Sequence, residues 1–473
     1  MSMEHIFTPE GYDKTYPSLL RALYNVNNLL KRDGIMAPSD SSLHNTLQLY
    51  DLVGRPLDRI QTVHVGGTNG KGTTAFKIAE CLRHSGIRTG LFVSPHISSF
   101  RERVQMNGQL ASEEELLRHL PPILRLCVAH SVPLTLFEIT FIYACVQFEA
   151  SGCQAVVLEV GLGGELDATN VVNTALSIIC SVSLDHMRIL GSTVEDIAQK
   201  KGGIFKRDVD ALVGPGCPYA VLKGIADQRG AKLHTLAEAY TKFSIPKGED
   251  EGQKTADLID TDGLNAEISL AALHLLRAQQ GSACASLDLG NGIVANILKN
   301  SRPPCRWERF LLPVMRRDSL QVQVEVVLDV GHNQAAVAAL MKRIKRDFSS
   351  RKVRLLYAMS RDKDVRTCLR AILATIPFDC IHFAQSDNFR AISQEELAAI
   401  FKEETGADVT DIEAVTAGLP LDENFMSSGK MNETLARVLA LTAHETEDGV
   451  LIICGTGYIM PDARAQIGIV EPR

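Results

Sequence analysis

A glycine-rich segment with one central lysine is the part of the sequence best suited to bind phosphate. Residues 63–74 read VHVGGTNGKGTT, a short β-type run that feeds a turn and then an amphipathic stretch. The N–H groups of such a turn and of the following helix converge on an anion, Lys71 adds positive charge, and a threonine hydroxyl can reach Mg²⁺. The segment departs from G-x-x-x-x-G-K-[ST], because Val65 replaces the first glycine and Gly72 separates Lys71 from Thr73. We interpret it as a phosphate-binding loop; the alternative is a plain strand-to-helix turn.

Two later apolar runs end in residues that can bind a metal ion. Glu159 follows the run 155–158 and leads into the glycine-rich segment 160–170, and the next run ends at Asp185 and His186. Phosphoryl-transfer sites of this kind need an acidic residue at the end of a neighbouring buried strand to hold Mg²⁺. By itself, His186 is more often a structural histidine. Beside the loop and Glu159, we interpret it as a second metal ligand.

The overall charge leaves the binding of anions to local groups. The 473 residues contain 49 Lys and Arg against 56 Asp and Glu, a formal net charge of -7, in a chain that is 45% hydrophobic. This ordinary composition excludes disorder, collagen and coiled coil as the main architecture. Without a block of basic residues, nucleic acid and anionic membranes are not expected as partners. Any anionic ligand must be held by particular basic side chains.

Cysteine usage and the N-terminal residues predict a cytoplasmic protein. The eleven cysteines form no C-x-x-C pair, and several lie inside apolar runs, as is typical of buried thiols in a reducing compartment. No stretch approaches the ~18 consecutive apolar residues of a membrane span. The first residues have neither a signal-peptide core nor an Arg-rich transit pattern.

Alternating apolar runs and amphipathic stretches predict an α/β fold in which helices cover mostly parallel sheets. We expect a P-loop NTPase-like domain at residues 1–300 and a second, smaller α/β domain at 301–473, with the boundary near the paired prolines 303–304. Residues 245–263 carry no periodicity and predict a surface loop. The strands are predicted at 62–65, 89–93, 155–160, 176–182, 322–328, 353–358, 381–384 and 450–454. The helices are predicted at 18–31, 72–84, 113–119 behind Ser112, 195–200 behind Ser192, 334–345, 365–374 and 394–402, with a further amphipathic helix starting in 134–140.

Taken together, these segments resemble the Mur ligase superfamily, and specifically its folate branch of folylpolyglutamate synthases and dihydrofolate synthases. The loop 67–73 is similar to that branch's G-T-N-G-K-G-S, whose extra glycine the cell-wall ligases lack. The resemblance runs in family order from about residue 18 to the C-terminus. It rests further on Ser94-Pro95-His96 and on residues 101–104, 159–170, 184–186, 201–206, 306, 328–333 and 361–364.

The resemblance implies an ATP site with Mg²⁺, two ions being expected. The nucleotide contacts it implies are Gly67, Thr68, Asn69, Gly70, Lys71, Gly72, Thr73 and Thr74, with Arg306 and Asp329 from the second domain. The implied metal ligands are Thr73, Glu159, His186 and Lys201, the last of them carbamylated. A carbamate suits the place because it is an anion with two oxygen ligands, whereas an ammonium would be repelled by Mg²⁺. Lys71, Lys201 and His332 are the implied catalytic residues.

The resemblance also assigns the folate groove to the first domain. The substrate residues it implies are Ser94, Pro95, His96, Arg101, Arg103, Phe137 and Glu138. Residues 94–103 carry no helical pattern and predict a loop over the site, and its arginines can hold carboxylates bidentately. It is equally open that Arg101 and Arg103 are solvated loop residues that bind no substrate. It is equally open that Phe137 belongs to the hydrophobic core and not to the groove.

Three departures from the family pattern weaken particular assignments. Glu165 stands where many bacterial members have Arg, which makes it a poor anion ligand. Residues 265–269 replace a His-Gln-x-x-Asn pattern and retain neither the Gln nor the Asn. Cys305 precedes Arg306 where the family has glycine, so Arg306 is aligned through its neighbours alone.

The family implies an ATP-dependent ligase that adds L-glutamate to the γ-carboxylate of a reduced folate through an acyl phosphate. Dihydrofolate synthase, or one chain with both activities, is the close alternative. A cell-wall ligase is disfavoured, because only 66 residues precede Gly67 and leave no room for its nucleotide-sugar domain. The alternative from another class is a P-loop NTPase switch without ligation. We expect small-molecule substrates, no nucleic acid, no membrane and a monomer.

Overall fold

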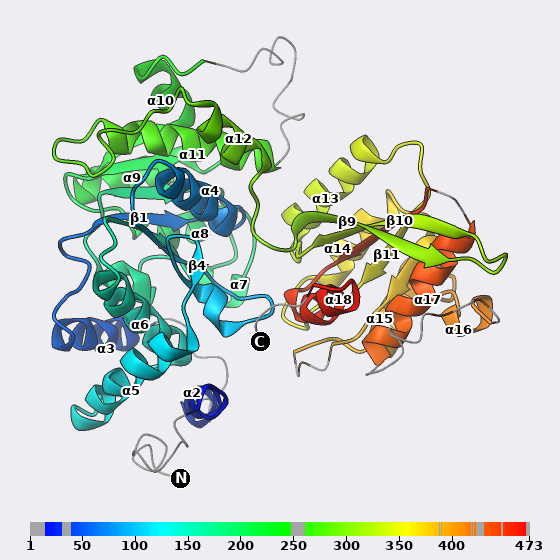
Figure 1. Ribbon diagram of the computed structural model, residues 1–473. Helices are drawn as coiled ribbons and strands as arrows, with labels where there is room; N and C mark the ends of the chain where they lie inside the picture. Colours follow the sequence, from blue (N-terminus) through cyan, green and yellow to red (C-terminus); the bar gives the residue numbers. More distant parts are fainter. Residues whose placement is uncertain are drawn as a thin grey trace. The chain divides into compact units, whose positions relative to one another are not determined.

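The computed structural model divides the chain into two compact units (Figure 1). The first contains the described residues up to Ser301 except 97–99, and the second contains 97–99 and the described residues from Arg302 on. Each unit is described by itself. The structure describes residues 15–30, 39–246, 261–386, 388, 390–417, 419, 421, 430–445 and 448–469.

The first unit is built on an eight-stranded sheet with the order β4-β3-β2-β5-β1-β6-β7-β8. It is parallel except where the short hairpin β3–β4 pairs antiparallel with β2. The central strand β1 lies between β5 and β6, so three predicted strands are neighbours. The strands are β1 Gln61–Gly66, β2 Thr89–Phe92, β3 Val104–Met106, β4 Gln109–Leu110, β5 Ala155–Glu159, β6 Leu176–Ile179, β7 Asp210–Val213 and β8 Lys232–Thr235.

Helices cover both faces of this sheet, with α4, α11 and α12 on one face and α5 and α6 on the other (Figure 1). The helices are α2 Tyr16–Leu30, α3 Asp40–Leu52, α4 Lys71–His84, α5 Glu113–Ala129, α6 Leu136–Ala150, α7 Met187–Leu190, α8 Val194–Gly202, α9 Tyr219–Arg229, α10 Leu236–Lys242, α11 Thr261–Arg277 and α12 Gly292–Asn300. Two 3₁₀ turns, η2 Phe100–Arg103 and η3 Ala168–Val171, precede β3 and β6.

The pleat of β1 directs its side chains to two different cores. Val63 and Val65 pack with α4 and α11, whereas His64 is buried on the opposite face. Successive side chains of a strand alternate between faces, so neighbouring residues of one strand serve both layers.

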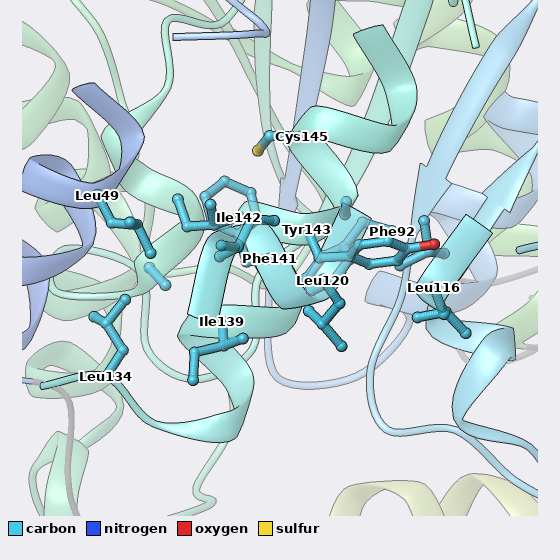
Figure 2. Close-up of a cluster of buried hydrophobic side chains, with 14 of the residues drawn as sticks. Leu49, Phe92, Leu116, Leu120, Leu134, Ile139, Phe141, Ile142, Tyr143 and Cys145 are labelled. Atoms are coloured by element: carbon cyan, nitrogen blue, oxygen red, sulfur yellow. The ribbon is translucent and has the colours of Figure 1, made fainter. Parts of the chain in front are cut away.

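Helix α6 lies inside the second of these layers. The prediction of an amphipathic helix here is wrong, because Ile139, Phe141, Ile142 and Tyr143 are all buried and point in different directions around the helix (Figure 2). A helix that is apolar on every side is a core helix. Thr135 caps it, accepting a hydrogen bond from the Glu138 N–H.

A fully buried lysine ties the phosphate-binding helix to the end of the first unit. Lys77 of α4 donates from Nζ to the carbonyl oxygens of Leu298 at 2.7 Å and Ser301 at 2.8 Å. The same amine lies 3.2 Å from Oδ1 of Asp262 at the start of α11. Because a buried ammonium needs such partners, Lys77 fixes α11, α12 and the last residue of this unit against α4.

The second unit contains a five-stranded sheet with the order β12-β11-β13-β10-β9, parallel except for the edge strand β9. Strand β9 was not predicted, because its outward side chains include exposed Leu311 and Met315 that hide the alternation. The strands are β9 Arg306–Met315, β10 Gln321–Asp329, β11 Val353–Tyr357, β12 Ile381–Phe383 and β13 Val450–Cys454. The helices are α13 Gln334–Asp347, α14 Val365–Leu373, α15 Gln394–Thr405, α16 Ile412–Val415, α17 Lys430–Glu445 and α18 Met460–Gln466.

The predicted α/β class is confirmed, and several predicted boundaries are corrected. The expected loop 245–263 is wrong at its end, since α11 begins at Thr261; residues 247–260 lie outside the described part of the chain. Thr193, and not Ser192, caps α8. Strand β6 ends at Ile179, so 180–183 form a loop.

Among the described residues, no helix is long and apolar enough to cross a membrane. The eleven cysteines are free thiols, and all except the partly exposed Cys217 are buried.

Candidate active site

The glycine-rich segment forms a tight turn between β1 and α4. Gly67 has φ 140° and Gly70 has φ 87°, backbone conformations that residues with a Cβ avoid. Gly70 occupies the N-cap position of α4, where no side chain caps the helix. The first-turn N–H groups and the positive end of the helix dipole therefore face the turn, as an anion site requires.

The loop after β6 holds this turn in place. The Thr68 N–H donates to the Ser181 carbonyl at 2.8 Å, and the Thr68 hydroxyl bonds both backbone groups of Ser183. The Ser181 hydroxyl likewise accepts from the Asn69 N–H at 3.0 Å and donates to its carbonyl at 2.9 Å. Sequence reasoning missed both serines. The shape of the turn is thus set by hydrogen bonds from a neighbouring strand end.

Glu159 lies against the start of α4, as the parallel register of β1 and β5 dictates by pairing it with Val65. It is buried, and its Oε2 accepts the Ser94 N–H at 2.8 Å. A Cβ on Gly72 would lie 3.2 Å from each carboxylate oxygen. The extra glycine of the loop therefore makes room for this carboxylate beside the helix, one residue before Thr73.

Two lysine side chains donate hydrogen bonds to backbone carbonyl oxygens of the turn. Lys71 Nζ donates to the Thr68 carbonyl at 3.0 Å, and the buried Lys201 Nζ donates to the Gly67 carbonyl at 2.8 Å. Burial first, and then the positive charge of Lys71, lowers the pKa of Lys201 to about 7. A neutral amine is the form that reacts with CO₂, so the setting of Lys201 fits the carbamate that the resemblance implies.

The side chain of His186, which the sequence predicts as a second metal ligand, is more exposed than that of Glu159. His186 has φ 48° at the start of α7, its side chain is 38% exposed, and its Nε2 lies 3.9 Å from Asp185 Oδ1. Within the described part of the chain, no three His, Cys, Asp or Glu side chains form a metal-binding group. Carboxylate and hydroxyl oxygens at Glu159 and Thr73 still suit Mg²⁺, which prefers a few protein ligands and keeps several waters.

A pocket of about 280 Å³ lies next to Glu159, with Ser94 in its wall. The ring of Phe137 touches Gly161, where a Cβ would come within 2.4 Å of it, and the ring also packs on Phe92 at 5.8 Å. Phe137 therefore belongs to both pocket and core. The pocket is lined by Ser42, Ser94, Pro95, Arg103, Thr135, Phe137, Glu138, Gly161, Leu162, Leu166, Asp167 and Ala168.

Asp167 is a buried carboxylate in this pocket to which sequence reasoning gave no role. Its Oδ2 accepts the Leu162 N–H at 2.8 Å, and its Oδ1 accepts the N–H and the hydroxyl of Thr169 at 3.0 and 2.5 Å. Burial raises the pKa of Asp167, and these hydrogen bonds oppose the rise. Its place in the glycine-rich segment beside Glu159 was the available signal.

The other predicted substrate residues separate into two groups. Arg103 and Glu138 line the pocket, although Glu138 also accepts the Thr135 N–H at 2.6 Å as part of the helix cap. Arg101 donates to the Ala111 carbonyl, and His96 Nδ1 accepts from Arg103 at 2.8 Å. Neither lines the pocket. The expected loop 94–103 is wrong in its last part, which forms η2.

Helix α11 brings two further residues to the phosphate-binding loop. Asn265 Oδ1 lies 3.4 Å from the Thr74 hydroxyl, and a Cβ on Gly70 would come within 2.3 Å of it. Ser269 donates to the Thr74 carbonyl at 3.4 Å. The departure from the family pattern at 265–269 therefore lies in contact with the loop. The partly exposed Glu165 pairs with Arg229 and Lys200.

In the second unit, Asp329 joins the start of β9 to the end of β10. Its Oδ2 accepts the Trp307 N–H at 3.0 Å and its Oδ1 the Gly331 N–H at 2.8 Å. Arg306 is its cross-strand partner at a bulge, and the Arg306 charge opposes the rise that burial gives to the pKa of Asp329. The His332 ring donates from Nδ1 to the Val330 carbonyl at 2.8 Å.

Comparison with known proteins defines the class to which this site belongs. The family model of the Mur ligase middle domain matches residues 65–214, and that of the Mur ligase glutamate ligase domain matches residues 315–455. The phosphate-binding loop, Glu159 and every pocket-lining residue except Ser42 fall within the first match. The chain is thus built from Mur ligase domains.

Similar proteins narrow the class. A dihydrofolate synthase/folylpolyglutamate synthase of Bacillus subtilis is 32% identical over 365 residues, 74% of this chain and 82% of that protein. A probable dihydrofolate synthetase of Schizosaccharomyces pombe is 28% identical over 438 residues, 90% of this chain and 98% of that protein. A solved bifunctional folylpolyglutamate synthase/dihydrofolate synthase with Mn, AMPPNP and L-glutamate bound has a TM-score of 0.72 at 25% identity, covering 95% of this chain and 97% of that one.

This chain belongs to the dihydrofolate synthase/folylpolyglutamate synthase family of ATP-dependent ligases. The resemblance identified from its sequence motifs is confirmed.

Proposed function

We propose that the protein joins L-glutamate to the γ-carboxylate of a reduced folate, using ATP and forming ADP and phosphate. One observation carries the proposal: Ser94 lines the aromatic pocket and donates its N–H to Glu159, which touches the start of the phosphate-binding helix. An acceptor bound in the pocket would thus have its carboxylate end near the phosphates, as transfer requires.

At the ATP end of the site, the backbone N–H groups of the segment 67–74 and the charge of Lys71 neutralise charge on the transferring phosphoryl group. Mg²⁺, bound with the nucleotide, would supply further neutralisation, held by Thr73, Glu159, His186 and the Lys201 carbamate. The acceptor carboxylate attacks the γ-phosphate, ADP leaves, and the amine of glutamate then displaces phosphate from the acyl phosphate. The solved structure of a similar protein with Mn, AMPPNP and L-glutamate bound supports ATP, a divalent metal ion and glutamate as the small molecules of the reaction.

The acceptor side uses the pocket beside Glu159. Phe137 offers a flat apolar face on which a ring can pack. The carboxylate of Asp167 can accept hydrogen bonds from ring N–H or amino groups of the substrate. Arg103 in the same wall can pair with a carboxylate. A pterin-type head with a glutamyl tail combines these features.

The roles of the two domains are part of this proposal. The domain at 1–300 would bind ATP and folate, and the domain at 301–473 would add Arg306, Asp329 and His332. The proposal includes a cytoplasmic monomer whose partners are its small-molecule substrates.

A glutamate-incorporation assay with dihydropteroate and with tetrahydrofolate as acceptors tests the function. The proposal expects ADP release that requires an acceptor and glutamate, products extended on tetrahydrofolate, and loss of turnover in Lys71→Ala. Extension of dihydropteroate alone would identify a dihydrofolate synthase, the name of the Schizosaccharomyces pombe relative. ATP hydrolysis independent of both substrates would instead indicate a switch NTPase and overturn the proposal.

A further inference from the structure

The side chains behind Asp167 form a buried chain that ends on the central strand. The Thr169 hydroxyl lies 2.5 Å from Asp167 Oδ1 and 2.8 Å from His64 Nε2. Thr169 and His64 are fully buried, and Asp167 is 2% exposed. The other ring nitrogen of the histidine, Nδ1, is buried and has no hydrogen-bond partner.

The direction of this chain follows from counting protons. A threonine hydroxyl has one proton to donate, and Thr169 donates it in the hydrogen bond to Asp167. The same hydroxyl can then only accept from His64, so Nε2 must carry the proton and Nδ1 must be bare. A second proton on the ring would leave a buried N–H without an acceptor, which is costly. His64 is therefore a neutral donor.

The hydrogen bonds are therefore donated in one direction, from His64 to Thr169 and from Thr169 to Asp167 in the pocket wall. The two backbone N–H groups of Leu162 and Thr169 point the same way, so every one of these hydrogen bonds favours the ionised carboxylate. No lysine or arginine forms an ion pair with Asp167 in the part of the chain that the structure describes. Neutral donors thus hold a buried negative charge in the acceptor pocket.

We propose that His64 is a positioning residue for the folate acceptor: through Thr169, it fixes the Asp167 carboxylate in the orientation that accepts hydrogen bonds from the acceptor's ring. This inference rests on the proposed function and extends it to a residue that touches no substrate. The competing reading is that Asp167 only caps η3, with Thr169 and His64 filling space behind it.

Kinetics of the full-length enzyme separate the two readings. Thr169→Val removes the hydroxyl at nearly constant volume, and we expect the KM for the acceptor to rise about tenfold. The KM for ATP should change less than about twofold, since the phosphate-binding turn keeps its own hydrogen bonds. Thr169→Ser, which restores the hydroxyl, should return the acceptor KM to near the wild-type value. A structural defect would not be rescued in this way.

The control variant is Thr62→Val, which removes a buried hydroxyl from the same strand as His64. That hydroxyl donates to the Ile60 carbonyl and does not reach Asp167. The acceptor KM should stay at the wild-type value. If Thr62→Val and Thr169→Val raised the acceptor and ATP KM values alike, a general packing defect would be the cause and the proposal would be wrong.

A double-mutant cycle tests whether His64 acts through Thr169. His64→Phe, which keeps a ring but has no donor, should raise the acceptor KM in the wild-type background and add nothing in Thr169→Val. If the effects of the two substitutions on the acceptor KM multiplied, His64 would act independently of Thr169 and the proposal would be wrong. If Thr169→Val does not fold, the comparison of His64→Phe with the donor-bearing His64→Gln decides, because equal acceptor KM values would contradict the proposal. Failure of the proposed function is recognised separately, by a wild-type enzyme that shows no acceptor-dependent ADP release.

Discussion

The amine of Lys201 donates a hydrogen bond to the carbonyl oxygen of Gly67, 2.8 Å away, inside the phosphate-binding turn. The neighbouring Lys200 is 45% exposed and pairs with Glu165 at 3.7 Å. Two consecutive lysines of one helix therefore have different environments, and burial gives Lys201 the lowered pKa that favours a reactive amine.

We expect Lys201 to carry CO₂ as a carbamate. Enzyme equilibrated with ¹³C-bicarbonate should show a carbamate resonance by ¹³C NMR that disappears in Lys201→Met and persists in Lys200→Met. Turnover should fall about tenfold to hundredfold in Lys201→Met, the range for losing support of a metal site. A signal that depends on Lys200 instead would contradict the assignment.

Gly72→Ala should separate stability from activity. Alanine is the better helix former by about 1 kcal/mol, and Gly72 lies in the first turn of α4, so the melting temperature should hold or rise. The new Cβ would meet both oxygens of Glu159, and the KM for MgATP should increase about tenfold. Gly224→Ala in α9 is the control, because no atom lies within 4 Å of its added Cβ and activity should not change.

Lys77→Met should destabilise the first unit by about 3–5 kcal/mol, since it leaves Asp262 and two carbonyl oxygens without their cation. Urea unfolding followed by circular dichroism measures the loss. Lys242→Met, on an exposed side chain of α10, should leave the unfolding midpoint nearly unchanged. Equal midpoints for the two variants would show that the buried contacts contribute little.

The buried His64 should make the fold sensitive to acid. Burial first, and then the charge of Lys206, lowers the pKa of His64 to about 3 from a usual value of 6.5. Between these pH values the unfolded chain binds a proton that the folded chain does not, so stability falls as the pH drops from 6.5 towards 3. Urea unfolding between pH 7 and pH 5 should show a smaller loss of stability for His64→Phe than for wild type. Equal losses would mean that the histidine is not kept neutral by the fold.

The sequence predicted the parts of the site that lie on local motifs. The segment 67–74 and Glu159 at the end of a neighbouring strand are local patterns, and they lie close together because β1 pairs in parallel with β5. Asn265 could not be placed, because its contact with Gly70 depends on α11 packing on α4 across 195 residues of chain. The role of Asp167 was missed for a related reason. Leu162 and Thr169 donate to it locally, but His64, which bonds Thr169 from β1, is 105 residues away from Thr169 in the sequence.

The same limit applies to the elements. Short β-type apolar runs identified β1, β5 and β10. Helix α6 was predicted as amphipathic because sequence periodicity does not reveal that a helix is enclosed on all sides. The exposed apolar residues of β9 obscured an edge strand in the same way.

Strand β1 carries His64 behind the acceptor pocket and leads directly into Gly67 of the phosphate-binding turn. Three residues of extended chain span about 10 Å, a length that covalent geometry holds constant. The strand therefore keeps His64, which supports Asp167 through Thr169, at a fixed distance from the phosphate-binding turn. An inhibitor that tethers a pterin-like head to a phosphonate should gain affinity only when its linker spans the distance between the pocket and the turn, so a series of linker lengths should show one optimum.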